Sequence, residues 1–325
     1  MQHKNRIDLY REITDTIIEK LEAGGLPPWR QPIVTAGDPS PKNLHTQQTY
    51  RGVNFWLLLL RAWERGYERP LWLTFHQAKQ RGARVRKAER GTRVIFWKRC
   101  EGRSQEERSA EKAGREERQA NHVFQVVKHY TVFNVSQIEG LELTPLPGPG
   151  EAAFDPIAKA EAVLAGYAGG PETVTGGSRA AYEPKVDRVL MPEPGRFETP
   201  ESYYATLFHE QVHSTGHSSR LNRGLGEKLA PFGSPDYSKE ELVAEVGAVY
   251  LCAAAGISQP TLEQTAAYLE GWIGRFRQDK KLIVQAAGQA QRAADLILGV
   301  TFDGAAGGGR EAKPRVAEET PKPGR

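Results

Sequence analysis

Cysteine and long apolar runs are scarce in this sequence of 325 residues. The two cysteines, Cys100 and Cys252, are too few and too far apart for a disulfide framework or a thiolate metal site, which favours a reducing compartment. The longest apolar run, residues 55–60, is far too short to span a bilayer. The N-terminal segment is polar and carries no apolar core of an export signal. We therefore expect a soluble, cytoplasmic protein with no membrane partner.

Positive charge, by contrast, is concentrated in the first half of the chain. Residues 51–99 contain 13 Lys or Arg and three Glu, whereas the second half is closer to neutral. A basic domain predicts a polyanionic partner, of which nucleic acid is the commonest.

Hydrophobic periodicity predicts two domains of the α+β class. An N-terminal α+β domain spans residues 1–145 and contains a charged insert at about 101–121. A linker rich in Pro and Gly covers 146–156, a mostly helical domain with a small sheet covers 157–302, and residues 303–325 have the composition of a disordered tail. Helices are expected at 7–21, 50–65, 74–81, 157–165, 199–216, 238–255, 261–273 and 281–298, and strands at 94–98, 123–135, 173–179 and 180–191.

The clearest chemical signal is an H-E-x-x-H motif inside the helix expected at 199–216. His209 and His213 lie four residues apart, so one helix face can present two imidazoles to a single metal ion. Glu210 can then act as the general base on a metal-bound water without occupying the metal's coordination sphere. This pattern predicts a zinc site of the metallopeptidase type, with manganese as the alternative metal.

The third ligand is open at this stage. A metzincin histidine would fall at position 219, which is Ser219, and His217 lies past the glycine that we expect to end the helix. The segment E-L-V-A-E at 241–245 offers Glu241 as a ligand and Glu245 either as an alternative ligand or as an acid that orients a ligand histidine. Glu240 and His217 are further alternatives. A competing interpretation is that Ser238 and Glu241 form a helix capping box, which would direct Glu241 to its own backbone. No oxyanion donor can be chosen among Tyr237, Tyr250, Arg220 and His217.

In the basic half, aromatic residues alternate with cations, a pattern typical of single-stranded nucleic-acid binding. Trp56 and Trp63 lie on an apolar helix stripe and are expected in the core. The candidate nucleic-acid contacts are Trp29, Arg30, Arg51, Lys79, Arg81, Arg84, Arg86, Lys87, Arg90, Arg93, Trp97 and Lys98.

Longer motifs in both halves resemble one family. The segments PPWRQP at 27–32, TYRGVNFWLLL at 49–59 and YTVFNVSQIEGL at 130–141 resemble the N-terminal domain shared by ArdC-type antirestriction proteins and TraC-like primases. The segments YYATLFHEQVHSTGH at 203–217 and EELVAEVGAVYL at 240–251 resemble the zincin-like metallopeptidase domain that follows it in ArdC. The resemblance implies a protein of plasmids and conjugative elements that binds single-stranded DNA and protects incoming DNA from host restriction.

Two functions compete on this basis. In the first, the zincin site is a catalytic His/His/Glu metallopeptidase whose substrate is a host restriction enzyme or another protein. In the second, the chain is a non-catalytic single-stranded-DNA-binding protein whose metal is structural.

Overall fold

The computed structural model describes residues 9–23, 40–102, 122–144, 156–225, 235–257 and 266–300. Most of the charged insert and the linker, the whole C-terminal tail, and Trp29 and Arg30 lie outside the described residues. Within the described ranges, no helix combines the length and apolar character needed to cross a bilayer.

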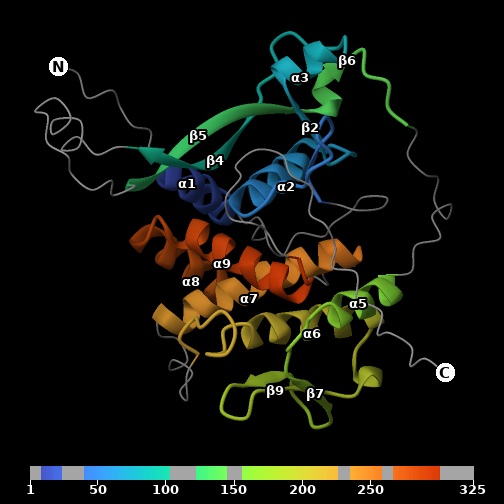
Figure 1. The fold of residues 1–325 in the computed structure, drawn as a ribbon, viewed down its shortest axis with the longest axis vertical. Coiled ribbons are helices and arrows are strands. Elements are labelled where there is room, and N and C mark those ends of the chain that lie inside the picture. Colours follow the sequence, from blue (N-terminus) through green and yellow to red (C-terminus); the bar gives the residue numbers. More distant parts are fainter. Residues whose placement is uncertain are drawn as a thin grey trace, which may run out of the picture.

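The N-terminal half is built around a four-stranded sheet in the order β1-β2-β5-β4 (Figure 1). Its strands are β1 (Lys42–Asn43), β2 (Leu71–Thr74), β4 (Thr92–Gly102) and β5 (His122–Asn134), and only the β1–β2 pairing is parallel. Side chains alternate between the two faces. Trp72, Val94 and Val132 pack against helix α2 (Val53–Arg65), whereas Leu73 packs with Ala78 of helix α3 (Phe75–Gln80). The sheet is therefore covered by different helices on its two faces.

Local interactions determine where α3 begins and hold the basic residues that follow it in place. The Thr74 hydroxyl accepts from the backbone of Gln77, and the Gln77 side chain accepts from the backbone of Thr74, which is a complete capping box. After α3, a two-stranded ladder joins β3 (Arg84–Val85) to β6 (Ile138–Glu139). This ladder ties the basic segment, defined as residues 79–93, to the chain that leaves β5.

The described residues of the C-terminal half form five helices beside a small sheet. The sheet contains β7 (Glu172–Thr175), β9 (Arg188–Met191) and β8 (Ala181–Glu183) in that order, with β8 antiparallel to β9. The helices are α5 (Pro156–Ala165), α6 (Pro200–Ser214), α7 (Pro235–Ala255), α8 (Ala266–Gln278) and α9 (Leu282–Ile297). The predicted single strand over 180–191 was wrong, because Asp187 has a φ of 49° and the chain turns there to form the β8–β9 hairpin.

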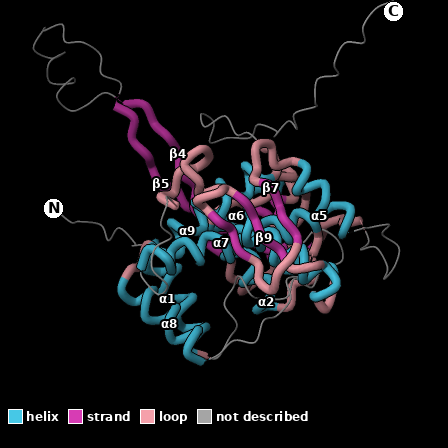
Figure 2. The backbone as a smooth tube through the Cα atoms, turned by 90° about the horizontal axis from the view of Figure 1, so that it is seen from below, coloured by secondary structure: helices cyan, strands magenta, loops and turns pink. Residues whose placement is uncertain are grey.

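The two halves share one apolar core. Ile17 of α1 (Leu9–Glu22) and Phe55 of α2 belong to the same cluster of buried residues as Leu251 of α7 and Trp272 of α8. Figure 2 shows α1 lying alongside α8, and Figure 1 shows α2 above α7 and α9. The α+β class is confirmed, and continuous packing joins the two halves.

Candidate functional site

Helix α6 carries the H-E-x-x-H motif, and its position is fixed by its start and by its buried face. Thr199 is the N-cap, with its side chain accepting from Ser202 N at 3.1 Å, and Pro200 occupies the first helical position. Leu207, Phe208 and Val212 are buried in the core. That packing holds the neighbouring side of the helix, with His209 and His213, toward Glu241 of α7.

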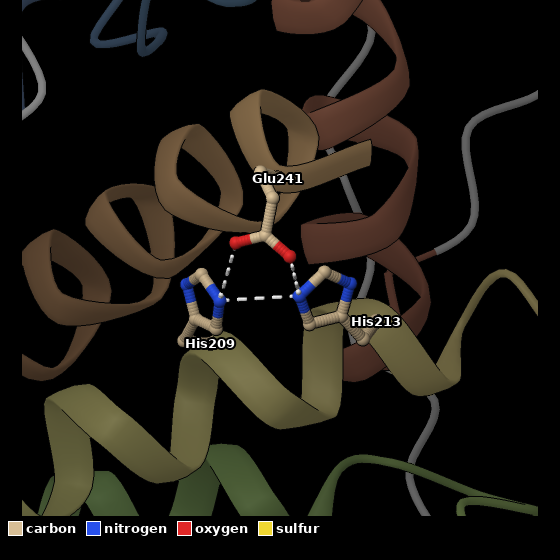
Figure 3. Close-up of side chains that lie close together, drawn as sticks. All are labelled: His209, His213 and Glu241. Carbon is tan, nitrogen blue, oxygen red and sulfur yellow. Dashed lines mark hydrogen bonds and ion pairs between the residues drawn. The ribbon is translucent and has the colours of Figure 1, made fainter. Parts of the chain in front are cut away.

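His209 and His213 of α6 and Glu241 of α7 converge in space (Figure 3). The two Nε2 atoms are 3.1 Å apart. Glu241 Oε1 is 3.4 Å from His213 Nε2, and Glu241 Oε2 is 3.6 Å from His209 Nε2. Ligand atoms at tetrahedral positions about 2.0–2.1 Å from one ion are about 3.3 Å apart, so the observed spacing fits a zinc-sized tetrahedral centre.

The capping-box alternative for Glu241 does not agree with the helix that forms. Helix α7 begins at Pro235, three residues before Ser238, so Ser238 lies inside the first turn and is not the N-cap. The Glu241 carboxylate lies instead beside the two imidazoles (Figure 3). Among the described residues, these three side chains form the group whose ligand atoms could hold a metal.

A second carboxylate orients His213 from the other side of its ring. His213 Nδ1 lies 3.4 Å from Glu240 Oε1, and an ionised carboxylate only accepts, so Nδ1 carries a proton. In the neutral ring that binds a metal, this leaves the lone pair on Nε2. Arg223 grips Glu240 with two hydrogen bonds, Nε to Oε2 at 3.0 Å and Nη2 to Oε1 at 2.6 Å. Glu245, which the spacing favoured for this kind of role, is buried one turn further along α7, and its role stays a prediction.

Arg223 is itself locked to the motif helix. It donates to the Val212 carbonyl at 2.8 Å and to the Thr215 hydroxyl at 2.6 Å, and only 6% of its side chain is exposed. The sequence did not indicate Glu240 and Arg223 as a pair, because Arg223 comes from the irregular segment after α6, where no periodicity applies. The C-terminal end of α6 and the start of α7 are thus joined by a buried ion pair next to the site.

The electrostatics favour a cation at this position. Burial alone would lower the pKa of His213, but hydrogen bonds to Glu240 and Glu241 outweigh it and raise that pKa to about 10. Burial alone would raise the pKa of Glu241, but the two histidines hold it well below its usual range. Two carboxylates therefore act on one imidazole, and in the absence of metal a proton on His213 balances part of their charge.

Glu210 is held by the nearest strand rather than by the metal-ligand group. Its Oε2 accepts the backbone N–H of Tyr182 at 2.8 Å. Tyr182 lies in β8, at an edge of the three-stranded sheet, so its N–H points away from β9 and toward α6. This contact fixes the carboxylate of Glu210, and the sequence carried no signal for it.

The candidate oxyanion donors are dispersed. Tyr250 is buried against α2, and Arg220 is committed to Asp187 and to the Ser214 carbonyl. His217 is half-buried, and its Nδ1 accepts the Ser219 N–H at 3.2 Å. The Tyr237 side chain lies outside the described part of the chain. His217 is not among the three residues whose ligand atoms converge.

The predicted nucleic-acid contacts fall into two groups. Six cations of the basic segment are exposed, namely Lys79, Arg81, Arg84, Arg86, Lys87 and Arg90. Some of them also hold the turn in place: Arg84 pairs with Glu139, Arg86 donates to the Ser136 carbonyl, and Arg81 donates to the Leu44 carbonyl at 3.1 Å. The segment is therefore fixed in place, and Glu139 and Glu89 balance part of the charge of Arg84 and Arg86.

The other predicted contacts are less available or lie outside the described side chains. Arg51 forms an ion pair with Asp295 of α9, which balances its charge at the contact between the two halves. Arg93 is half-buried, and Trp56 is a core residue as expected. The side chains of Trp63, Trp97 and Lys98, like Trp29 and Arg30, are not among those described.

Two family models match the chain, one in each half, which confirms the predicted two-domain architecture. Residues 7–133 match the N-terminal domain of the anti-restriction factor ArdC, and residues 158–289 match a zincin-like metallopeptidase domain. Two crystal structures of the antirestriction ArdC protein from the R388 plasmid are similar to the chain. The metal-free form is 36% identical with a TM-score of 0.69, and the alignment covers 89% of this chain and 96% of that one. The Mn(II)-bound form is 37% identical with a TM-score of 0.68, and the alignment covers 89% and 97%.

Curated relatives include proteins of very different length. DNA primase TraC of Escherichia coli is 35% identical over an alignment of 302 residues that covers 89% of this chain and 27% of that protein. The chain thus spans about a quarter of this TraC. The uncharacterized protein y4eC of Sinorhizobium fredii (strain NBRC 101917 / NGR234) is 34% identical over 290 residues, which are 89% of this chain and 91% of y4eC.

Proposed function

The chain belongs to the ArdC family of antirestriction proteins, and we propose that it binds single-stranded DNA and protects incoming plasmid or conjugated DNA from host restriction. The exposed basic segment supports the DNA-binding part. Seven Lys or Arg and one Glu lie within residues 79–93, which suits phosphate contacts that do not depend on base sequence. Binding is expected to be steeply dependent on salt.

His209, His213 and Glu241 would hold one divalent metal ion. The spacing of their ligand atoms supports this assignment, as does the Mn(II) in the crystal structure of R388 ArdC. Two imidazoles and a carboxylate are typical of zinc, and manganese is the alternative. When bound, such a metal lowers the pKa of a coordinated water and polarises a carbonyl.

The observation that carries the catalytic proposal is the openness of the site. About a quarter of each of the His209 and Glu241 side chains is exposed, at 24% and 27%, whereas structural zinc sites are closed by four protein ligands. Three protein ligands leave a position for water. Glu210, next to His209 and fixed by Tyr182 N–H, would take the proton from that water and pass it to the leaving amine of a peptide bond. The protein substrate would be a host restriction enzyme or another host protein.

A conservative variant separates this proposal from the non-catalytic alternative. Glu210→Gln keeps the size of the side chain and an acceptor for Tyr182 N–H, but it removes the base. In cells that carry a restriction system, we expect Glu210→Gln to bind metal normally and to lose protection of incoming DNA. Glu201→Gln, in the first turn of the same helix, is the matched control and should protect like the wild type.

Full protection by Glu210→Gln would show that hydrolysis is not needed. If His209→Ala, which removes a ligand, then lost both folding stability and protection, the metal would be structural and the chain a DNA-binding protein. The DNA-binding part is tested separately by measuring the affinity of the full chain for single-stranded DNA across a salt series.

A further inference from the structure

Two aromatic side chains lie next to each other on the surface of the β4–β5 hairpin. In the strand register Val94 pairs with Tyr130, and Phe96 pairs with Lys128, so Phe96 and Tyr130 are diagonal neighbours on one face. Their ring centroids are 5.3 Å apart at an interplanar angle of 79°. We call them the aromatic pair.

The aromatic pair marks the point where this face of the hairpin leaves the core. Val94 and Val132, on the same face but nearer the sheet, are completely covered by the packing with α2. One step further along the strands, Phe96 is 44% exposed and Tyr130 is 45% exposed. Figure 2 shows β4 and β5 extending together away from the helices. Both rings thus have accessible surface while their backbone is anchored in the sheet.

The exposed fractions of Phe96 and Tyr130 show that the core does not need these two rings to be covered. Single exposed apolar side chains are common on soluble proteins, but two rings in contact on adjacent strands form a small platform, which is a feature of binding surfaces. A rigid strand pair that displays aromatic rings is how several folds stack the bases of single-stranded nucleic acid.

The surrounding charge indicates which partner the platform fits. The basic segment runs directly into β4, and Thr92 is four residues from Phe96, or about 13 Å along an extended strand. Exposed Arg90 is six residues from Phe96, so its backbone lies at most about 22 Å from that of Phe96. A partner that combines regularly spaced negative charge with accessible flat apolar faces is single-stranded DNA, because a duplex hides its base faces in the stack.

We propose that Phe96 and Tyr130 stack on nucleotide bases and so select single-stranded over duplex DNA, while the basic segment holds the phosphates. This inference rests on the proposed DNA-binding function and adds its base-contacting residues. Phosphate contacts by the basic segment would not distinguish single strands from duplex DNA, and base stacking on these two rings would supply that preference.

Ring-retaining and ring-removing substitutions provide the test. In the full-length protein, Phe96→Leu and Tyr130→Leu keep an apolar side chain but remove the ring, whereas Phe96→Trp and Tyr130→Phe keep a flat face. We expect each Leu variant to weaken binding to a 20-nucleotide oligo-dT by about 5- to 100-fold, and the aromatic variants to bind within about twofold of wild type. The slope of log affinity against log salt should be unchanged in all four, because no cation is removed.

Oligonucleotides with abasic sites make the assignment specific to bases. The wild type should bind a strand of abasic sites more weakly than oligo-dT, and the Leu variants should show a smaller difference between the two probes. Leu variants that bind oligo-dT like the wild type, with normal thermal stability, would overturn the inference even though the protein still binds DNA. A wild type with no affinity for oligo-dT at low salt would overturn the proposed DNA-binding function itself.

Discussion

The most informative single perturbation is the removal of one hydroxyl at the contact between the two halves. Tyr250 of α7 is 6% exposed, and its OH donates to the Gly52 carbonyl at 2.8 Å and accepts from Trp56 Nε1 at 2.8 Å. Its ring meets Phe55 edge to face at 4.9 Å. Burial raises the pKa of this phenol in spite of the hydrogen bond from Trp56, so the group stays neutral and the interaction does not depend on pH.

The expected loss of stability on Tyr250→Phe follows from the two polar groups that lose their hydrogen bond to the Tyr250 hydroxyl. Trp56 is 2% exposed, so its N–H would be left buried without an acceptor, at a cost of about 1–3 kcal/mol. The Gly52 carbonyl is in a half-buried turn and loses a neutral hydrogen bond worth about 1 kcal/mol. We therefore expect a loss of about 2–4 kcal/mol. At about 2–4 °C per kcal/mol, this corresponds to a drop in Tm of roughly 4–16 °C.

Calorimetry and urea denaturation of the full chain measure this loss, with Tyr130→Phe as the control. Tyr130 is 45% exposed, so its change is expected to be within about 0.5 kcal/mol. Since Ile17 and Phe55 share a core with Leu251 and Trp272, the two halves should lose stability together in one transition. A Tyr250→Phe protein as stable as the wild type, or two transitions of which only one moves, would refute the reasoning.

Three further outcomes follow from the metal-ligand group and the basic segment. Glu240→Gln should raise the Kd for the metal by about 10- to 100-fold in a chelator competition, because the carboxylate that holds His213 Nδ1 is lost. Metal affinity should increase with pH between pH 6 and 9, because the pKa of His213 is raised to about 10 and a metal ion must displace its proton. Titration calorimetry in buffers of different ionisation enthalpy measures the proton released, and a pH-independent affinity would contradict the prediction. Lys87→Gln and Arg90→Gln should each reduce the salt slope of single-stranded-DNA binding by about 0.7–1, whereas Arg51→Gln should leave it unchanged because Arg51 pairs with Asp295.

Local sequence signals predicted the site where periodicity applies. The i, i+4 spacing of His209 and His213 and the apolar positions around them predicted α6 with its two imidazoles on one face. Glu241 was the preferred third ligand, with Glu245, Glu240 and His217 as alternatives. The start of α7 at Pro235 and the distances to the two imidazoles speak against the competing capping interpretation. A helix boundary shifted by one turn is therefore enough to change which role a carboxylate is assigned.

The parts that could not be predicted depend on segments that meet only in three dimensions. Glu240 and Glu241 are adjacent in sequence, but Glu240 contacts Nδ1 of His213 and Glu241 contacts Nε2. Arg223, from an irregular loop, holds Glu240 in this position by an ion pair. Likewise, the contact from Tyr182 N–H to Glu210 requires the β8–β9 hairpin, which the alternating pattern at 180–191 concealed. The sequence pattern identifies candidate site residues, whereas the residues that they contact are determined by tertiary packing.

Helix α7 links the chemistry of one half to the fold of the other. It carries Glu240 and Glu241 in its first two turns and Tyr250 about 14 Å further along, where that residue contacts α2. Helix α2 in turn packs under Val94 and Val132, next to the aromatic pair of the hairpin. A continuous series of packed elements therefore runs from the metal-ligand group to the proposed DNA surface. The two family domains divide the proposed functions of this chain. They nevertheless share one core, because α1 and α2 bury their apolar faces against α7, α8 and α9.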